Sequence, residues 1–324
     1  GSLLFPMVFG LEAMAQAACY VTGTEKIKSL RFKNIILERP IPVSQESGTT
    51  IEVRAEVLET IDHAKVARVE IYCEQTNYKE PHFAAILEIN PTIKTSDSKL
   101  ISKEKLRTPI DLDLGTDIYG PILFQGKMFQ RIDKIHELFY NTKTEKGECL
   151  FTSESNGCPE DFLKINQKYG NRFLIGDPFF TDSLLQSMQL IITQEACLPN
   201  RIEEIEIGYL NQVQPRQGFI VKSKLEKISG HFLNGNAEAF HNNNAVIKIK
   251  DCRLKIIDHL LTNPPANDLV NPAQRDSKIF SVFIKKMSEI EHLILPKIYF
   301  TFWKDFLNKN RDQRKLVVKQ WLRE

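Results

Sequence analysis

Apolar and polar residues alternate along several stretches of this chain, and two other stretches repeat apolar residues at helical spacing. The clearest alternation lies within 49–61, in the run TIEVRAEVLE, and predicts a strand with one solvated face. The Ala-rich run Met7 to Tyr20 predicts a helix, with Gly23 as its C-terminal cap. Further strands are predicted at 26–43, 65–75 and 82–90.

The same order of elements occurs a second time. A Lys- and Ser-rich stretch, 91–109, is predicted to be a linker, and 181–196 then has the broad apolar face of a helix. Strands are predicted after it at 201–214, 218–229, 231–240 and 244–257. An apolar helix followed by long strands, present twice, predicts an α+β fold in which each copy wraps a helix in an antiparallel sheet.

This repeat sets the expected domain organisation. We expect a first unit at 1–95, a linker at 96–117, a second unit at 118–260 and a helical C-terminal extension at 261–324. The sequence opens with apolar residues and no Met, and it stops inside an amphipathic run. These ends predict that the chain is part of a longer polypeptide.

Composition excludes several classes of function. Lys and Arg exceed Asp and Glu by two, which predicts neither a nucleic-acid partner nor an anionic membrane surface. No apolar run approaches the roughly 20 residues of a membrane span. The six cysteines form no CxxC pair, so we expect no metal site and reduced thiols in a cytoplasmic protein.

Two acidic residues are candidates for chemistry. Asp182 and Gln186 are four residues apart, on one face of the second predicted helix and near its start. Apolar surroundings would raise the pKa of the carboxyl, as a general acid requires, and Gln186 would orient it. Glu12 and Gln16 repeat this spacing 170 residues earlier. The alternative is that Asp182 stabilises the helix N-terminus, and that Glu12 is structural.

Three stretches resemble the dehydratase domains of polyketide synthases. Residues 1–6, GSLLFP, are similar to the end of the family's HxxxGxxxxP motif, and 119–126, YGPILFQG, to its YGP and FxG segment. Residues 177–186, DPFFTDSLLQ, are similar to HPALLDAxxQ, which places the family's Asp and Gln at Asp182 and Gln186. The resemblance implies a tandem double hotdog, each half a central helix wrapped by an antiparallel sheet.

The resemblance also implies a reaction. A hydro-lyase of this family removes water from a 3-hydroxyacyl thioester, carried on the phosphopantetheine arm of an acyl carrier protein, and leaves a trans-2-enoyl thioester. A His base takes the α-proton, Asp182 protonates or orients the leaving hydroxyl, Tyr119 bonds near that hydroxyl, and no metal or redox cofactor is implied. Further implied substrate contacts are Gly1, Pro6, Gly120, Pro121, Phe124 and Gly126. Implied partners are the carrier protein, other synthase domains and a second copy in a homodimer.

A second resemblance bears on the choice of acid. Residues 6–16, PMVFGLEAMAQ, are similar to the helix of single-hotdog 3-hydroxyacyl carrier-protein dehydratases, whose Glu is the acid. Glu12 is therefore a second candidate, although in tandem dehydratases the acid comes from the second hotdog, which favours Asp182. Residues 311–323 are similar to a region of phosphopantetheinyl transferases, which iterative enediyne-type synthases place after their dehydratase.

The chain departs from the family at two points. The motif's His would lie upstream of Gly1, and none of the seven His present occupies such a motif. Gly176-Asp177-Pro178 stands where the family has His-Pro. Two alternatives to an active enzyme therefore stay open: a non-catalytic acyl-binding hotdog that has lost its base, and a product-template-like domain.

Overall fold

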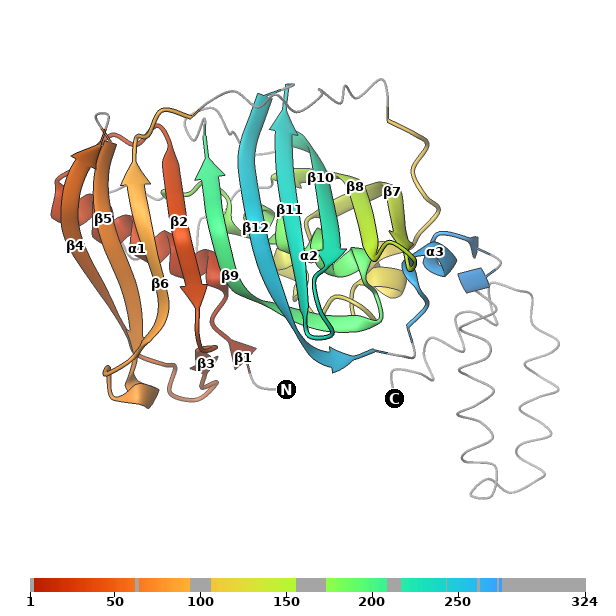
Figure 1. Cartoon of the computed structure of the whole chain (residues 1–324), viewed down its shortest axis with the longest axis horizontal. Helices are drawn as coiled ribbons and strands as arrows, with labels where there is room; N and C mark the ends of the chain where they lie inside the picture. Colours follow the sequence, from red (N-terminus) through yellow and green to blue (C-terminus); the bar gives the residue numbers. More distant parts are fainter. Residues whose placement is uncertain are drawn as a thin grey trace, which may run out of the picture.

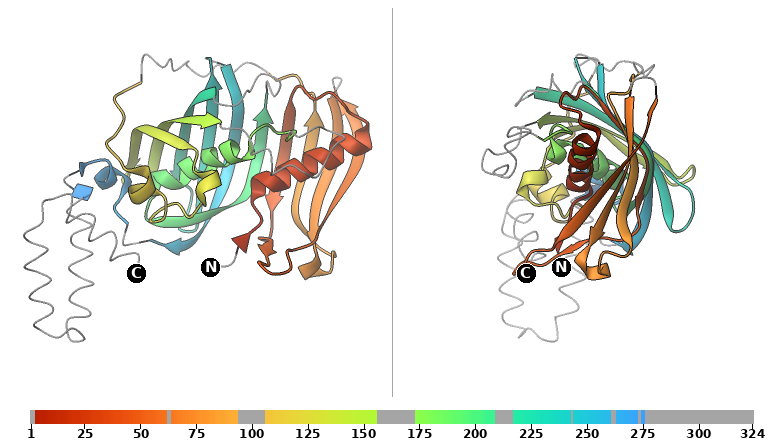
Figure 2. Two further views of the ribbon diagram at one scale, coloured as in Figure 1. Left: turned by 180° about the vertical axis from the view of Figure 1, so that it is seen from behind. Right: turned by 90° about the vertical axis from the view of Figure 1, so that its left-hand side faces the viewer.

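A single antiparallel sheet carries, on one face, the two long helices of the described residues (Figures 1 and 2). The computed structural model describes residues 3–61, 64–93, 106–155, 173–208, 217–242, 244–260, 263–272 and 274–275. In these ranges the ten strands are ordered β4-β5-β6-β2-β9-β12-β11-β10-β8-β7, and every neighbouring pair is antiparallel. A two-stranded sheet pairs β1 with β3.

The elements fall into two groups along the chain. The first group is β1 Leu3–Leu4, α1 Met7–Thr22, β2 Leu30–Leu37, β3 Pro42–Val43, β4 Ile51–Ile61, β5 Ala64–Cys73, η1 Glu74–Thr76 and β6 Pro81–Ile89. The second is η3 Leu114–Ile118, η4 Lys127–Phe129, β7 Ile132–Asn141, β8 Lys146–Ser155, α2 Pro178–Ile191, β9 Glu195–Ile207, β10 Gln217–Lys227, β11 Phe232–His241, β12 Asn244–His259 and α3 Ala266–Leu269.

Helix α1 lies across β4, β5 and β6. Its small residues permit close packing: a Cβ on Gly10 would stand 2.8 Å from the ring of Phe83. The helix ends where predicted, because Gly23 adopts the left-handed conformation at φ 62° and its N–H caps the last turn.

Helix α2 lies over β7 to β11, and most of its residues are buried. Asp177 caps its start by accepting a hydrogen bond from Phe180 N at 3.1 Å, and Pro178 occupies the first helical position. The predicted helix 181–196 is wrong at both ends. It begins three residues earlier because of this cap, and β9 begins at Glu195.

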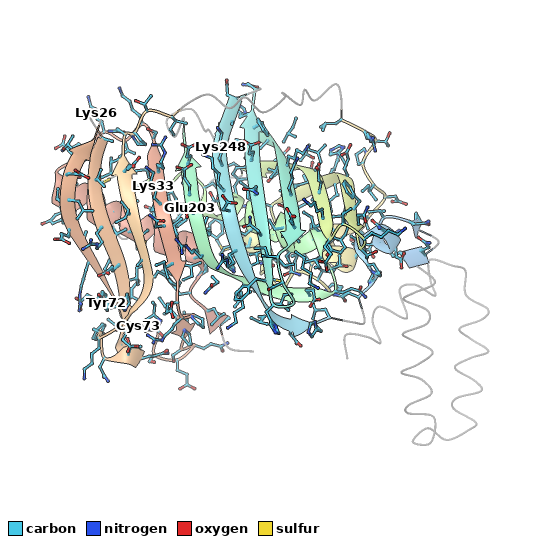
Figure 3. All side chains as sticks on the ribbon, in the orientation of Figure 1. Lys26, Lys33, Tyr72, Cys73, Glu203 and Lys248 are labelled. Atoms are coloured by element: carbon cyan, nitrogen blue, oxygen red, sulfur yellow. The ribbon has the colours of Figure 1, made fainter. Side chains whose placement is uncertain are left out.

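The two groups join along β2 and β9. Arg31 on β2 donates to Glu88 at 2.8 Å and to Glu206 at 2.8 Å, so one guanidinium bridges β6, β2 and β9. These three side chains are largely buried. The network lies on the face opposite the helices, where Figure 3 labels Lys33 and Lys248 beside it.

Most predicted strands are found, with three errors. The predicted strand 26–43 is two strands, β2 and β3, and the strand predicted at 201–214 begins at Glu195. β7 and β8 were not predicted. Irregular pairing with β8 breaks the alternation of β7, so that its buried residues, 132, 135, 136 and 138, do not follow a period of two.

Two predicted segments lie largely outside the described residues. These are 94–105 of the predicted linker and 276–324 of the predicted helical extension. Within the described part, Ile110 N of the linker bonds to Ile135 O of β7 at 2.8 Å, and α3 lies beside β7. The domain boundaries stay a prediction.

Candidate active site

Asp182 and Gln186 form the pair that their spacing predicts. Gln186 Nε2 donates to Asp182 Oδ2 at 2.8 Å and to the backbone oxygen of Phe129, in η4, at 2.9 Å. Burial raises the pKa of Asp182 to about 6, and the hydrogen bond from Gln186 lowers it in part. Because α2 begins at Pro178, before the predicted start at 181, Asp182 lies at the start of the second turn and not in the first turn. Asp177 caps this helix, so Asp182 is not needed for that role.

Tyr119 extends this pair. Its hydroxyl donates to Gln186 Oε1 at 3.2 Å and accepts a hydrogen bond from Ile132 N at 3.3 Å. Burial raises the pKa of Tyr119 to about 12, so the phenol stays neutral and remains a donor at neutral pH. Tyr119, Gln186 and Asp182 therefore form one hydrogen-bonded chain.

Glu12 is buried with a different set of partners. Its Oε1 accepts from Gln16 Nε2 at 2.7 Å and from Leu174 N at 3.0 Å, and its Oε2 accepts from Ile175 N at 3.0 Å. Burial raises the pKa of Glu12, and these three hydrogen bonds act in the opposite direction. Both carboxylate oxygens are therefore engaged by the protein itself.

The two carboxyls, equivalent in the repeat, differ in what is left for a ligand. Leu4 and Phe5 stand 170 residues before Leu174 and Ile175, the residues that bind Glu12. The N–H of Phe5 instead donates to Ile41 O at 2.8 Å. Within the residues that the structure describes, Asp182 has one hydrogen-bond donor, Gln186, and Oδ1 has none.

Phenyl rings connect the start of α1 to this site. Phe9 meets Phe179 edge to face at a centroid distance of 5.4 Å, and Phe179 meets Phe129 at 4.9 Å. Phe9 also meets Phe129 at 6.1 Å and Phe173 at 5.7 Å. Because the backbone oxygen of Phe129 accepts from Gln186, this group of phenyl rings connects the first turn of α1 to the Asp182–Gln186 pair.

Comparison with known proteins decides the family. The profile described as "Polyketide synthase dehydratase N-terminal domain" matches residues 99–261, which is half of the chain. The chain belongs to the polyketide synthase dehydratase family. Its antiparallel sheet with few helices is a hotdog-like dehydratase fold. No curated protein matches the chain.

Solved structures of this family share the fold at low sequence identity. The dehydratase domain of PpsC from Mycobacterium tuberculosis, in complex with C12:1-CoA, is 15% identical with a TM-score of 0.55; the match covers 79% of this chain and 86% of that one. The dehydratase domain of the CurJ module of curacin polyketide synthase is 14% identical with a TM-score of 0.53, and the match covers 79% of this chain and 84% of that one. A trans-acyltransferase polyketide synthase enoyl-isomerase is 15% identical with a TM-score of 0.53, and the match covers 78% of this chain and 91% of that one.

The family's motif residues have different positions in the structure. Pro6 precedes the first residue of α1, and Gly1 lies outside the described residues. Gly120 turns the chain at φ 104°, with Pro121 and Gly126 exposed beside it, and the Phe124 side chain is 73% exposed. The YGP segment thus forms a turn and also supplies Tyr119, which donates to Gln186. The roles of Pro6 and 120–126 in binding substrate stay predictions.

The candidate site also contains groups that sequence reasoning missed. Backbone groups of Phe129, Ile132, Leu174 and Ile175 carry no signal in their side chains. Phe9 and Phe179 did carry one, because they stand 170 residues apart like the two acids. The departure at Asp177 also has a structural explanation: it caps α2 and accepts from Ser155 Oγ at 2.9 Å.

Other kinds of site have no support in the ranges described above. No cluster of three or more His, Cys, Asp or Glu side chains there is arranged to hold a metal ion. Five of the cysteines are described, and all five are buried free thiols. None of the described helices combines the length and apolar character needed to cross a membrane.

Proposed function

We propose that this domain dehydrates 3-hydroxyacyl thioesters to trans-2-enoyl thioesters within a polyketide synthase. Asp182 carries the proposal, because it is a carboxyl in an apolar site with one oxygen that no described group engages. A base removes the proton from Cα, the electron pair forms the double bond, and the β-hydroxyl leaves as water with a proton from Asp182.

The hydrogen bonds around Asp182 favour this direction of proton transfer. Gln186 Nε2 donates to Oδ2, which needs a lone pair there and leaves the acidic proton on Oδ1. With a pKa of about 6, the carboxyl is protonated in a useful fraction of molecules near neutral pH. Tyr119 fixes the Gln186 amide in the orientation that this requires.

The remaining parts of the reaction come from the family resemblance. In the family the base is the His of the HxxxGxxxxP motif, whose spacing would put it before Gly1 and lead it into α1; the first turn of α1 contacts Phe179, beside the Asp182–Gln186 pair, through Phe9. Backbone N–H groups near the start of α1 polarise the thioester carbonyl. The two helix-and-sheet groups are tandem hotdogs, and an acyl carrier protein delivers the substrate on its phosphopantetheine arm, without a metal or redox cofactor.

The enoyl-isomerase likeness makes double-bond migration the nearest alternative, since fold does not separate the two reactions. Migration takes a proton from one carbon and returns one to another, so a single base can serve both steps, whereas dehydration also needs an acid for the leaving hydroxyl. A second titratable group with an open oxygen, Asp182, therefore favours dehydration. A base-free binding module and a product-template-like domain have no such observation in their favour.

The decisive experiment compares Asp182→Asn with the parent protein in a chain that includes the upstream His. The substrate is a 3-hydroxyacyl phosphopantetheine thioester, and enoyl product is followed by mass spectrometry. We expect kcat to fall by roughly 10²-fold or more, because the general acid is lost. Glu25→Gln, at an exposed position of the first group, is the control. Activity of Asp182→Asn within a few fold of the parent would contradict the proposal.

Residues 1–324 without the motif His give a second test. We expect this chain to dehydrate the same thioester very slowly, because its sequence has no His in the motif. Rapid dehydration by these residues alone would show that the base has been assigned wrongly.

A further inference from the structure

Glu12 and Asp182 are equivalent in the repeat, yet Glu12 holds a piece of backbone. We infer that Glu12 is a positioning residue, whose carboxylate ties the lead-in of α2 to α1 and so fixes the place of Asp182. This rests on the proposed function in that Asp182 is taken as the acid. Glu12 acts through Asp182 and touches no reacting atom.

The contacts of Glu12 cross from one half of the fold to the other. Leu174 N and Ile175 N, both at 3.0 Å, belong to the segment before α2, whereas Glu12 is in the middle of α1. Glu12 is 3% exposed. Hydrogen bonds in a buried, low-dielectric setting are stronger than in water, and two donors on adjacent residues fix orientation as well as distance.

The hydrogen bonds to Glu12 affect the position of Asp182 through only a few residues of chain. Gly176, at φ 89°, follows Ile175 directly, and Asp177 then caps α2. A glycine in the left-handed region is a natural pivot, so the direction in which the helix leaves it depends on what holds its two sides. Glu12 holds one side, and Ser155 holds the other through Asp177. Asp182 lies five residues beyond that cap.

This position matters because the acid and the proposed base belong to different helices. The base precedes α1 and the acid is on α2, so their separation depends on how α1 and α2 are fixed to each other. The Phe9–Phe179 contact holds the two helices near each other but does not fix their orientation. The hydrogen bonds to Glu12 fix the position of the segment before α2 relative to α1. Misplacement by about 1 Å can cost roughly 10²-fold in rate.

The first experiment measures amide exchange in the resting protein. Glu12→Gln keeps the shape of the side chain but replaces one accepting oxygen by a donor. We expect hydrogen exchange at the amides of Leu174 and Ile175 to become at least about tenfold faster, because local opening becomes easier. Glu25→Gln, exposed on the same half, should leave these amides unchanged. Unchanged exchange in Glu12→Gln overturns the inference.

The second experiment asks whether the change reaches the acid. In protein labelled with ¹³C at aspartate carboxyls, the Asp182 titration should move in Glu12→Gln toward the ordinary aspartate value of roughly 4, as water gains access. A Glu12 that merely stabilises the fold would lower the melting temperature and leave this titration in place, which also overturns the inference. If Glu12→Gln does not fold, Glu12→Asp keeps the charge and should show the same changes in smaller measure.

Both readouts come from the resting protein, so they are decided even if the domain performs another reaction. A third result would overturn the inference in a different way. If Glu12→Gln stopped dehydration as fully as Asp182→Asn does, with exchange and titration both unchanged, Glu12 would be the acid.

Discussion

Gln186 donates a hydrogen bond to Asp182 across one turn of α2, at 2.8 Å. The same amide nitrogen donates to Phe129 O, and the amide oxygen accepts from Tyr119. Each polar atom of this buried side chain therefore has a partner, so the orientation of the amide is fixed. The protonation state of Asp182 and the stability of the second half of the fold are consequently linked through one residue.

Gln186→Leu separates these two effects. The pKa of Asp182 should rise further above 6, because the hydrogen bond that lowers it is lost. The free energy of unfolding should fall by roughly 1–3 kcal/mol, since Phe129 O and the Tyr119 hydroxyl lose their partner. Carboxyl titration by NMR and urea denaturation measure the two quantities. Gln16→Leu, the equivalent change on α1, should destabilise the protein without moving the Asp182 titration, and a matching shift there would count against the assignment.

Asp182→Asn should change how stability depends on pH. The folded pKa of about 6 lies above the unfolded value of about 4, so the folded carboxyl binds its proton more tightly. The contribution of Asp182 to the free energy of unfolding is fully present below pH ~4. It is lost as pH rises through ~6, a loss of about 3 kcal/mol. The Asp182→Asn variant does not have this loss, because an asparagine side chain does not titrate. Relative to the parent it should gain stability between pH ~4 and ~6 in denaturant titrations; a difference independent of pH would rule out the raised pKa.

Tyr119→Phe tests the outer end of the hydrogen-bonded chain. The change leaves the buried Ile132 N–H without its partner, which should cost roughly 1–3 kcal/mol in unfolding free energy. It also frees the Gln186 amide to rotate, so kcat should fall, although less than in Asp182→Asn, with KM little changed. Steady-state kinetics and thermal unfolding check both, and Tyr20→Phe, at an exposed position on α1, is the control. A variant with parental kcat would remove Tyr119 from the site.

Arg31→Ala tests the junction between the two halves. Removing the guanidinium takes the shared partner from Glu88 and Glu206, both largely buried, and leaves Lys33 and Lys248 as their remaining cations. We expect a loss of roughly 3 kcal/mol in unfolding free energy, at the lower end of the cost of breaking a buried ion pair. Arg68→Ala breaks an ion pair with Glu56 in which both side chains are more than half exposed, and should cost less than ~1 kcal/mol. Equal losses in the two variants would show that the junction network adds nothing special.

The repeat carried most of what could be predicted from sequence. It located both helices, most strands and both carboxyl–amide pairs, because a four-residue spacing on a helix places side chains together whatever surrounds them. It did not reveal β7, where irregular pairing hides the strand pattern, or β8 beside it. Nor did it separate Asp182 from Glu12. The difference lies in the backbone N–H groups of Leu174 and Ile175, and sequence does not say where a backbone donor will point.

The covalent link between the two halves has a consequence for that difference. In an assembly of two identical chains related by a two-fold axis, any substitution appears at both symmetry-related positions, so neither carboxyl can be given up without losing its twin. Here the equivalent positions belong to one polypeptide and can change independently. One carboxyl can therefore become part of the scaffold while the other keeps an oxygen free for a ligand, so that two equivalent positions of one chain take on different roles.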